Sequence, residues 1–251
     1  MSEKLKGKRA LVTAGAQGIG LAISRALLDA GCNVAVHYFS SADAANELKS
    51  EFGDRVEALQ ADLTDEAQTK QMVEKAVEAL GGLEILINNA GSLIARRRLE
   101  EIDMDFWQTV NDVNVTSMIN VTKFASPALR AANGAAVVNL ASLAGRKGGH
   151  PGSLAYSTAK GATLTMTRAL SNELGPDGVR VNALAPGLIL DTSFHETHTT
   201  KESAAKTIAG IPVGRAGNPQ DVAHAAIFLA EQFDGFIAGA TLDINGGVYS
   251  A

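Results

Sequence analysis

Lys8-Arg-Ala-Leu-Val-Thr13-Ala-Gly15-Ala-Gln17-Gly18-Ile19-Gly20 is the stretch that decides the fold. Its first part, residues 9–13, is predicted to be a short buried strand, and residues 18–30 are predicted to form an apolar helix. The glycines between them let the backbone approach a pyrophosphate, and the helix N-terminus offers that group unpaired N–H donors. A glycine-rich turn can also be a plain strand-to-helix connection. Its place between the first strand and the first helix favours dinucleotide binding.

Strands and helices alternate along the rest of the chain. Further strands are predicted at residues 33–38, 55–60, 83–88, 135–140, 179–184 and 241–244. Helices are predicted at residues 42–51, 65–80, 100–131 with interruptions near 111–114, 154–174, 201–209 and 219–231. This order predicts an α/β fold with right-handed crossovers: a doubly wound parallel sheet of about seven strands, with helices on both faces. We expect one Rossmann-type domain over residues 1–251, with a substrate loop at about 188–217, where periodicity is weak.

Composition narrows the class of protein. Hydrophobic residues make up 46% of the 251 residues and charged residues 20%, as in an ordinary globular protein. The 22 basic and 27 acidic side chains give a net charge of −5, so no basic excess exists to neutralise nucleic-acid phosphates. The sequence contains no apolar run of membrane-spanning length, and we expect no secretory signal, because no long apolar stretch follows the charged first residues. Its one cysteine, Cys32, suits a reducing compartment. We therefore expect a cytoplasmic protein without membrane or nucleic-acid partners.

Tyr156 and Lys160 lie four residues apart in the predicted helix 154–174, so they share one helix face. The pKa of a free tyrosine is about 10, and a neighbouring ammonium lowers it because the charge favours the phenolate. Such a phenol can exchange a proton near neutral pH. The pair alone is more often part of a solvated helix face, so the surrounding motifs decide its meaning.

Those motifs resemble the short-chain dehydrogenase/reductase family, and they occur in that family's order and approximate spacing. They are Thr13-x-x-x-x-Gly18-Ile-Gly20, Asn88-Asn-Ala-Gly91, Ser142, Tyr156-x-x-x-Lys160 and Pro186-Gly187. The resemblance covers essentially the entire chain, including Arg215-x-Gly217 and the closing residues 239–247. It implies an NAD(P)-dependent oxidoreductase that interconverts a secondary alcohol and a ketone by hydride transfer. It also implies a homotetramer built through the long helices and the C-terminal strand.

The resemblance assigns four catalytic residues. Tyr156 is the expected acid/base, and Lys160 is expected to lower its pKa and to bind the cofactor ribose. Ser142 is expected to hold the substrate oxygen, and Asn114 to support a proton relay through water to the lysine. The substrate is then a small carbonyl compound or alcohol.

The expected cofactor contacts come from five places in the chain. The glycine-rich turn supplies Gly15, Gln17, Gly18, Ile19 and Gly20, and the end of the second strand supplies Tyr38 and Ser40. Asp62 and Leu63 are expected near the adenine, Asn89, Ala90 and Gly91 along the adenosine side, and Pro186, Gly187 and Ile189 along the nicotinamide.

Two departures from the family pattern bear on the cofactor. Tyr38 stands where an acid usually accepts the ribose 2′-hydroxyl of NAD, which removes a repulsive charge against a 2′-phosphate. No arginine replaces that acid, and Gln17 stands where a base often does, so we expect NADP with NAD as the alternative. Ala14 replaces a glycine, and a positive φ there would cost about 1 kcal/mol.

Several alternatives stay open. The substrate is either a 3-oxoacyl thioester or a sugar or polyol, and a non-catalytic dinucleotide-binding or redox-sensing protein on the same fold is the alternative class. Two basic runs could select polar or anionic substrates, although such runs more often solvate a surface: Arg96 to Arg98, and Arg146, Lys147 and His150 on the loop before Tyr156. His195 and His198 have a metal-like spacing but no further ligand motif, so no metal is expected.

Overall fold

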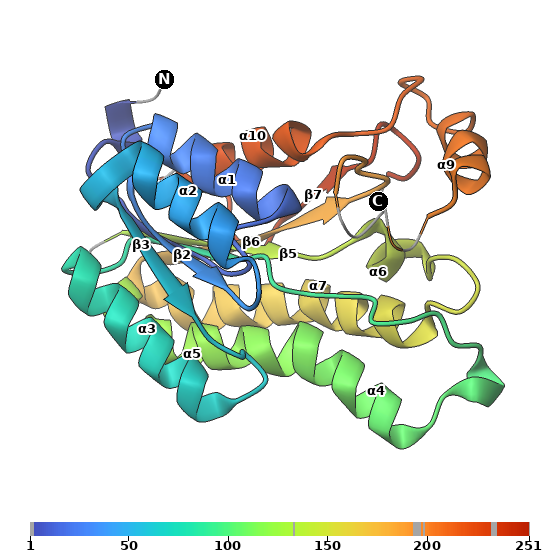
Figure 1. The fold of residues 1–251 in the computed structure, drawn as a ribbon, viewed down its shortest axis with the longest axis horizontal. Coiled ribbons are helices and arrows are strands. Elements are labelled where there is room, and N and C mark those ends of the chain that lie inside the picture. Colours follow the sequence, from blue (N-terminus) through green and yellow to red (C-terminus); the bar gives the residue numbers. More distant parts are fainter. Residues whose placement is uncertain (1–2, 133, 193–196, 198, 232–234, 251) are drawn as a thin grey trace.

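The computed structural model describes residues 3–132, 134–192, 197, 199–231 and 235–250. At its centre lies a parallel sheet of seven strands in the order β3-β2-β1-β4-β5-β6-β7 (Figure 1). The strands are β1 (Arg9–Val12), β2 (Asn33–Tyr38), β3 (Val56–Gln60), β4 (Ile85–Asn88), β5 (Ala135–Leu140), β6 (Val179–Pro186) and β7 (Thr241–Ile244). The predicted doubly wound α/β sheet is confirmed.

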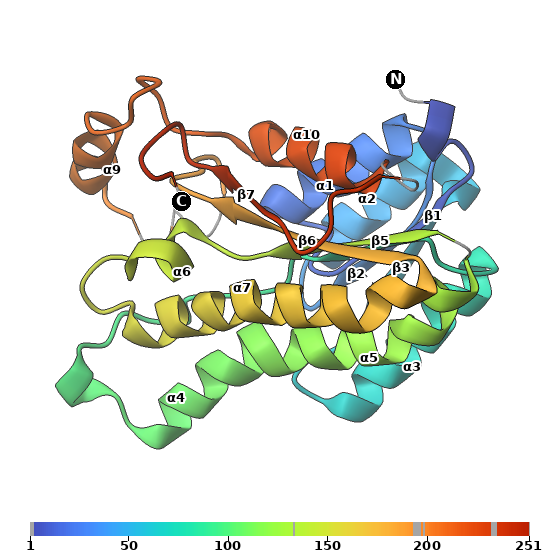
Figure 2. The ribbon, with the colours of Figure 1, turned by 180° about the vertical axis from the view of Figure 1, so that it is seen from behind.

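Helices cover both faces of the sheet (Figures 1 and 2). One face carries α1 (Gly18–Asp29), α2 (Ala42–Phe52) and α10 (Pro219–Ala230). The other carries α3 (Glu66–Leu80), α4 (Met104–Asn111), α5 (Ser117–Ala131) and α7 (Leu154–Leu174). Two further helices, α6 (Leu143–Lys147) and α9 (Lys201–Ile208), lie at the same end of the molecule. Among the described residues, no helix has both the length and the apolar character needed to cross a bilayer.

Strand β1 shows how the two cores form. Val12 packs into the cluster beneath α1 and α10, where Leu27 and Leu229 are also fully buried. Its neighbour Leu11 points to the opposite face and packs with Leu129 of α5. Successive side chains of a strand alternate between faces, so a continuous apolar run fits a strand that is covered on both sides.

Local signals place the helix ends. The Asp65 carboxylate accepts a hydrogen bond from the backbone N–H of Gln68 and so caps α3, which ends at Gly81 in the left-handed conformation. Helix α10 starts with Pro219 behind an Asn218 capping box. These caps satisfy backbone groups at the helix ends and so define where α3 and α10 begin.

One predicted region is interrupted as expected, and another differs from its prediction. The helical stretch predicted at 100–131, with interruptions near 111–114, is found as α4, a π-helical turn at Asp112–Thr116, and α5. Residues 143–147, expected to be loop, form the helix α6, whose N-cap is Ser142. A five-residue helix is too short to leave a periodic apolar pattern, whereas its cap is visible in the sequence.

The predicted substrate loop is closed at its base. Ile189 and Gly217 form a parallel bridge, in which Leu190 N–H donates to Gly217 O and Gly217 N–H donates to Leu188 O, both at 2.9 Å. A side chain at position 217 would collide with Ile189. This bridge fixes both ends of the loop beside the carboxyl end of β6. Helix α9 lies between these two ends.

Candidate active site

A cavity of about 320 Å³ opens at the carboxyl ends of the strands, where the strand order reverses between β1 and β4. Ligands of open α/β sheets bind at this point, because loops from the two halves diverge there. Many of the predicted site residues line the cavity: Gln17, Gly18, Ile19, Asn89, Gly91, Ser142, Tyr156, Lys160, Pro186, Gly187 and Ile189. The structure therefore brings the predicted phosphate turn and the predicted catalytic residues into one space.

The glycine-rich turn is shaped for a close approach of backbone to ligand. Gly18 has φ +49°, and Ala14 has φ +48°, so the alanine does occupy the left-handed region. A side chain at Gly20 would overlap the Ala14 carbonyl and the Asn89 side chain. The Gln17 side chain forms no capping hydrogen bond, and the first turn of α1 contains no acid. This helix end therefore suits an anionic ligand such as a pyrophosphate.

Thr13 and Asn89 fasten this turn to the end of β4. The Thr13 hydroxyl accepts hydrogen bonds from the backbone N–H groups of Asn89 at 2.9 Å and Ala90 at 3.0 Å. In return, the Asn89 amide donates to the carbonyls of Thr13 and Ala14 at 3.0 and 3.2 Å. These reciprocal bonds fix the two strand ends that face the cofactor side of the cavity.

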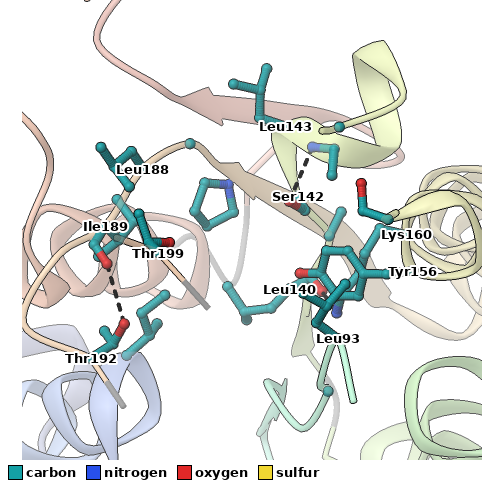
Figure 3. A pocket seen from close by; sticks show the side chains of 18 of the residues that line it. Leu93, Leu140, Ser142, Leu143, Tyr156, Lys160, Leu188, Ile189, Thr192 and Thr199 are labelled. Atoms are coloured by element: carbon teal, nitrogen blue, oxygen red, sulfur yellow. Dashed lines mark hydrogen bonds between the residues drawn. The ribbon is translucent and has the colours of Figure 1, made fainter. Parts of the chain in front are cut away.

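Ser142, Tyr156 and Lys160 lie together on the opposite wall, facing Leu188 and Ile189 across the cavity (Figure 3). A hydrogen bond joins the hydroxyls of Ser142 and Tyr156. The Lys160 ammonium donates to the Leu140 carbonyl at 2.8 Å and lies 5.8 Å from the centroid of the Tyr156 ring. The three residue types thus meet as expected, with two hydroxyls directed at one point of the cavity.

Burial controls the acidity of this pair. It raises the pKa of Tyr156 to about 12, although the hydrogen bond with Ser142 acts in the opposite direction. It also lowers the pKa of Lys160 to about 8. Loss of solvation is the larger of these two effects on the phenol, while the expected lowering of its pKa by the Lys160 ammonium stays a prediction. Tyr156 is a neutral phenol at pH 7, with a proton to donate.

Asn114 lies behind the cavity wall, in the π-helical turn. Its buried side chain donates to the carbonyls of Ser92 at 2.7 Å and Val110 at 2.9 Å, and accepts from the Ser92 N–H at 3.1 Å. A Cβ atom at Gly91 would lie 2.7 Å from Asn114 Oδ1 and 2.8 Å from Lys160 Nζ. Asn114 and Lys160 therefore adjoin the same glycine, while the relay role of Asn114 stays a prediction.

Several residues expected to contact the cofactor lie outside the cavity wall: Gly15, Gly20, Tyr38, Ser40, Asp62, Leu63 and Ala90. Tyr38 is half-buried against the core, Ser40 is exposed, and the Asp62 carboxylate accepts hydrogen bonds from the N–H and the hydroxyl of Thr64 at 2.9 and 2.6 Å. Leu63 and Ala90 pack beneath the turn, and Gly15 shapes it. Their contacts with a cofactor stay predictions. Ser41 donates to the Gln17 side chain at 3.1 Å, which joins the end of β2 to the turn.

Much of the remaining wall was not identified from the sequence. Its apolar part includes Leu93, Leu143, Leu188 and Val248, and its hydroxyl part includes Thr192, Thr199, Ser203 and Thr207. Three of these hydroxyls come from α9 and the residues before it. No motif marks them, because their position depends on how the 188–217 loop folds back over the cavity.

The basic loop residues divide between two roles. Arg146, expected to select the substrate, instead pairs with Asp243 of β7 through two hydrogen bonds of 3.1 and 3.2 Å. The position of Arg146 on α6 directs its side chain toward β7 and the sheet. Lys147 and His150 do line the cavity, as does Arg96.

A metal site gains no support. His195 and His198 lie outside the described residues, so their arrangement is not assigned. Within the described part of the chain, no three His, Cys, Asp or Glu side chains form a group that could hold a metal ion.

Comparisons with known proteins agree with this geometry. A family model described as Enoyl-(Acyl carrier protein) reductase matches residues 13–249. The chain is 36% identical to an acetoacetyl-CoA reductase of Shinella zoogloeoides over 240 residues, covering 96% of this chain and 98% of the relative. It is 34% identical to a 3-oxoacyl-[acyl-carrier-protein] reductase of Staphylococcus aureus over 250 residues, covering 96% and 98%. A crystal structure of a blue fluorescent protein from a metagenomic library, in complex with NADPH, superposes with a TM-score of 0.90 at 32% identity, covering 98% of this chain and 100% of that one.

Proposed function

This chain belongs to the short-chain dehydrogenase/reductase family, and we propose that it interconverts a ketone and a secondary alcohol with NADP(H), using Tyr156 as acid/base. Membership of the family makes it an NAD(P)-dependent oxidoreductase. The residue roles, the choice between cofactors and the substrate are the proposal.

One observation carries it: Ser142, Tyr156 and Lys160 occupy one wall of the cavity whose other end is the glycine-rich turn. The turn and the N-terminus of α1 fit the cofactor pyrophosphate, because the first turn of this helix has no side-chain cap and no acid, and Gln17, Gly18 and Ile19 line the cavity. Asn89, Gly91, Pro186, Gly187 and Ile189 would hold the rest of the cofactor along the cavity. When bound, the nicotinamide supplies or accepts the hydride.

The chain's own residues handle the oxygen of the substrate. Tyr156, protonated at neutral pH, donates its proton to the carbonyl oxygen during reduction and takes it back during oxidation. The Ser142 hydroxyl, already hydrogen-bonded to Tyr156, donates to the same oxygen and stabilises the charge that develops there. Lys160 is held at the Leu140 carbonyl, where its charge favours the deprotonated phenol that the reaction must pass through.

The end of β2 supports NADP over NAD. Residues 38–41 contain no acid that would repel a 2′-phosphate, and the Ser41 hydroxyl lies against Gln17. Activity with each cofactor at equal concentration tests this choice. NADP(H) should give the higher kcat/KM, and an NAD preference of about tenfold would contradict it.

A 3-oxoacyl thioester is the first candidate substrate, because the two relatives described above carry names of that chemistry. A sugar or polyol is the second candidate, favoured by the hydroxyls of Thr199, Ser203 and Thr207 in the cavity wall. Assays of acetoacetyl thioester reduction and of polyol oxidation separate the two. A protein that binds NADPH but turns over no carbonyl compound or alcohol would instead be a sensor on this fold.

We also propose that residues 1–251 form one cytoplasmic domain that assembles as a homotetramer. Large apolar side chains beside α4 and at the start of α7 support assembly: Leu99 is 72%, Met104 69% and Leu154 42% exposed. Light scattering coupled to gel filtration should give four times the mass of 26.0 kDa, and a monomer would contradict the proposal.

A further inference from the structure

The cavity has a one-sided charge. Its described lining residues include Arg96, Lys147, His150 and Lys160 but no aspartate or glutamate. The whole chain carries a net charge of −5, so this lining runs against the overall balance. A concave site lined by one sign of charge raises the local concentration of the opposite ion.

The fold places neighbouring residues of the two basic runs in different surroundings. Arg97 pairs with Asp103 at 2.7 Å and lies 4.3 Å from the Phe106 ring centroid, and Arg146 pairs with Asp243. Their neighbours Arg96 and Lys147 line the cavity instead, and no ion pair joins either of them to a described acid. Within these runs, Arg97 and Arg146 are therefore neutralised by acids outside the cavity, whereas Arg96 and Lys147 line it without an ion pair to a described acid.

These basic side chains stand on segments that are held in place. The backbone N–H of Arg97 donates to the Gly152 carbonyl at 3.0 Å, which joins the segment after β4 to the loop after α6. The Ser157 hydroxyl donates to the Gly148 carbonyl at 2.8 Å, and Ser153 is hydrogen-bonded to the His150 carbonyl. Fixed backbones reduce the entropy lost when the side chains bind a ligand.

We infer that Arg96, Lys147 and His150 form an anion-binding rim, which holds a carboxylate or phosphate of the substrate while its carbonyl lies at Ser142 and Tyr156. Arg96 supplies a planar fork of N–H donors, Lys147 an ammonium and His150 a ring donor. The rim comes from the β4–α4 connection, the last residue of α6 and the α6–α7 connection, whereas the phosphate turn follows β1, so different segments of the chain supply the two anion sites. This inference rests on the proposed function and deepens it.

Matched substrates test the rim and distinguish the two sources of charge. Acetoacetate is compared with its methyl ester for a carboxylate, and acetoacetyl-CoA with the acetoacetyl thioester of N-acetylcysteamine for the carrier phosphates. Arg96→Gln, Lys147→Gln and the double variant are compared with Arg98→Gln, which removes the same charge two positions from Arg96 and does not line the cavity. Steady-state kcat/KM is measured with NADPH at low and high salt.

The inference expects one anionic substrate to exceed its neutral partner in kcat/KM by about tenfold or more, with each rim variant lowering that preference by about tenfold. The neutral substrates and Arg98→Gln should show no comparable loss, and added salt should weaken the preference. Equal kcat/KM within both pairs, or equal losses on charged and neutral substrates, would overturn the rim while leaving the proposed function intact.

A binding measurement separates failure of the rim from failure of the proposed function. If no carbonyl compound is reduced, the proposed function fails. Thermal unfolding in the presence of malonate then tests the rim, because binding of this dianion can be measured without any turnover. Malonate should raise the Tm of the wild type and of Arg98→Gln but not of the double variant. The same shift in all three proteins, or a shift in none, would overturn the rim.

Discussion

The ring of His37 is hydrogen-bonded to the strained turn residue Ala14: its Nδ1 accepts the Ala14 backbone N–H at 3.0 Å. The other ring nitrogen, Nε2, donates to the Ala61 carbonyl at 3.1 Å, and the side chain is only 2% exposed. His37 thus spans from the phosphate turn after β1 to the end of β3. In the sequence, the only indication of this contact is a histidine within a mostly apolar strand.

Replacing His37 by leucine should destabilise the protein and weaken its cofactor binding. The change leaves the partly buried Ala14 N–H and the buried Ala61 carbonyl without these partners, at up to about 1–3 kcal/mol each. Urea unfolding measures the loss, and fluorescence titration measures the NADPH Kd, which should rise. His224→Leu, at an exposed position on α10, is the matched control and should change neither quantity. Equal behaviour of the two variants would show that His37 does not support the turn.

His37 also predicts the direction of a pH dependence. Burial lowers its pKa below the ordinary 6.5, so the folded state resists a proton that the unfolded state accepts. Because the unfolded state then binds more protons, the free energy of unfolding falls as the pH drops from about 6.5 toward the lower pKa of the folded protein. The Asp62 charge opposes this lowering and narrows the pH window. Unfolding curves across this range should show a smaller slope in His37→Leu than in the wild type.

Ala14→Gly should stabilise the protein. The left-handed backbone at position 14 is unfavourable for alanine and free of strain for glycine, so we expect a gain of about 0.5–1 kcal/mol in unfolding free energy. Ala22→Gly in α1 is the control for the same substitution and should cost about 1 kcal/mol instead. A loss of stability in Ala14→Gly would show that the turn is not strained.

Gly91→Ala should impair catalysis without unfolding the protein. The added methyl would lie within 3 Å of both Asn114 Oδ1 and Lys160 Nζ, so it pushes the ammonium away from its place near Tyr156. We expect kcat to fall by about tenfold or more, since small displacements at a reacting centre are costly. Gly175→Ala, where a Cβ meets nothing within 4 Å, is the control and should keep wild-type kcat. Wild-type kcat in Gly91→Ala would show that the position of Lys160 does not matter.

The regular elements were predictable because burial leaves a pattern in the sequence. Strand β5, helix α7 and strand β7 have the predicted bounds. In β5, for example, every residue is buried, and the apolar residues 135–138 and Leu140 indicate this burial, with Asn139 as the one polar member. The convergence of Tyr156 and Lys160 was expected from their spacing on one helix, and that of Ser142 from the resemblance to the family.

The rest depended on contacts between distant parts of the chain. Arg146 and Asp243 are 97 residues apart, and no local pattern links them. Burial raises the pKa of Tyr156, and this burial depends on how distant parts of the chain pack around the ring. The sequence shows only the adjacent Lys160 charge, which predicts a lower pKa. The choice of Arg96 and Lys147 over their neighbours as lining residues likewise depends on how two connections pack together.

The most direct test of the central claim is turnover by Tyr156→Phe, measured with the best substrate of the carbonyl panel beside the Kd for NADPH. The substitution removes only the hydroxyl, so NADPH binding should be unchanged while kcat falls by about 100- to 10,000-fold, the usual contribution of a general acid. Tyr249→Phe removes the same group from a residue outside the cavity wall and should keep wild-type kcat. Retained turnover in Tyr156→Phe would contradict the account.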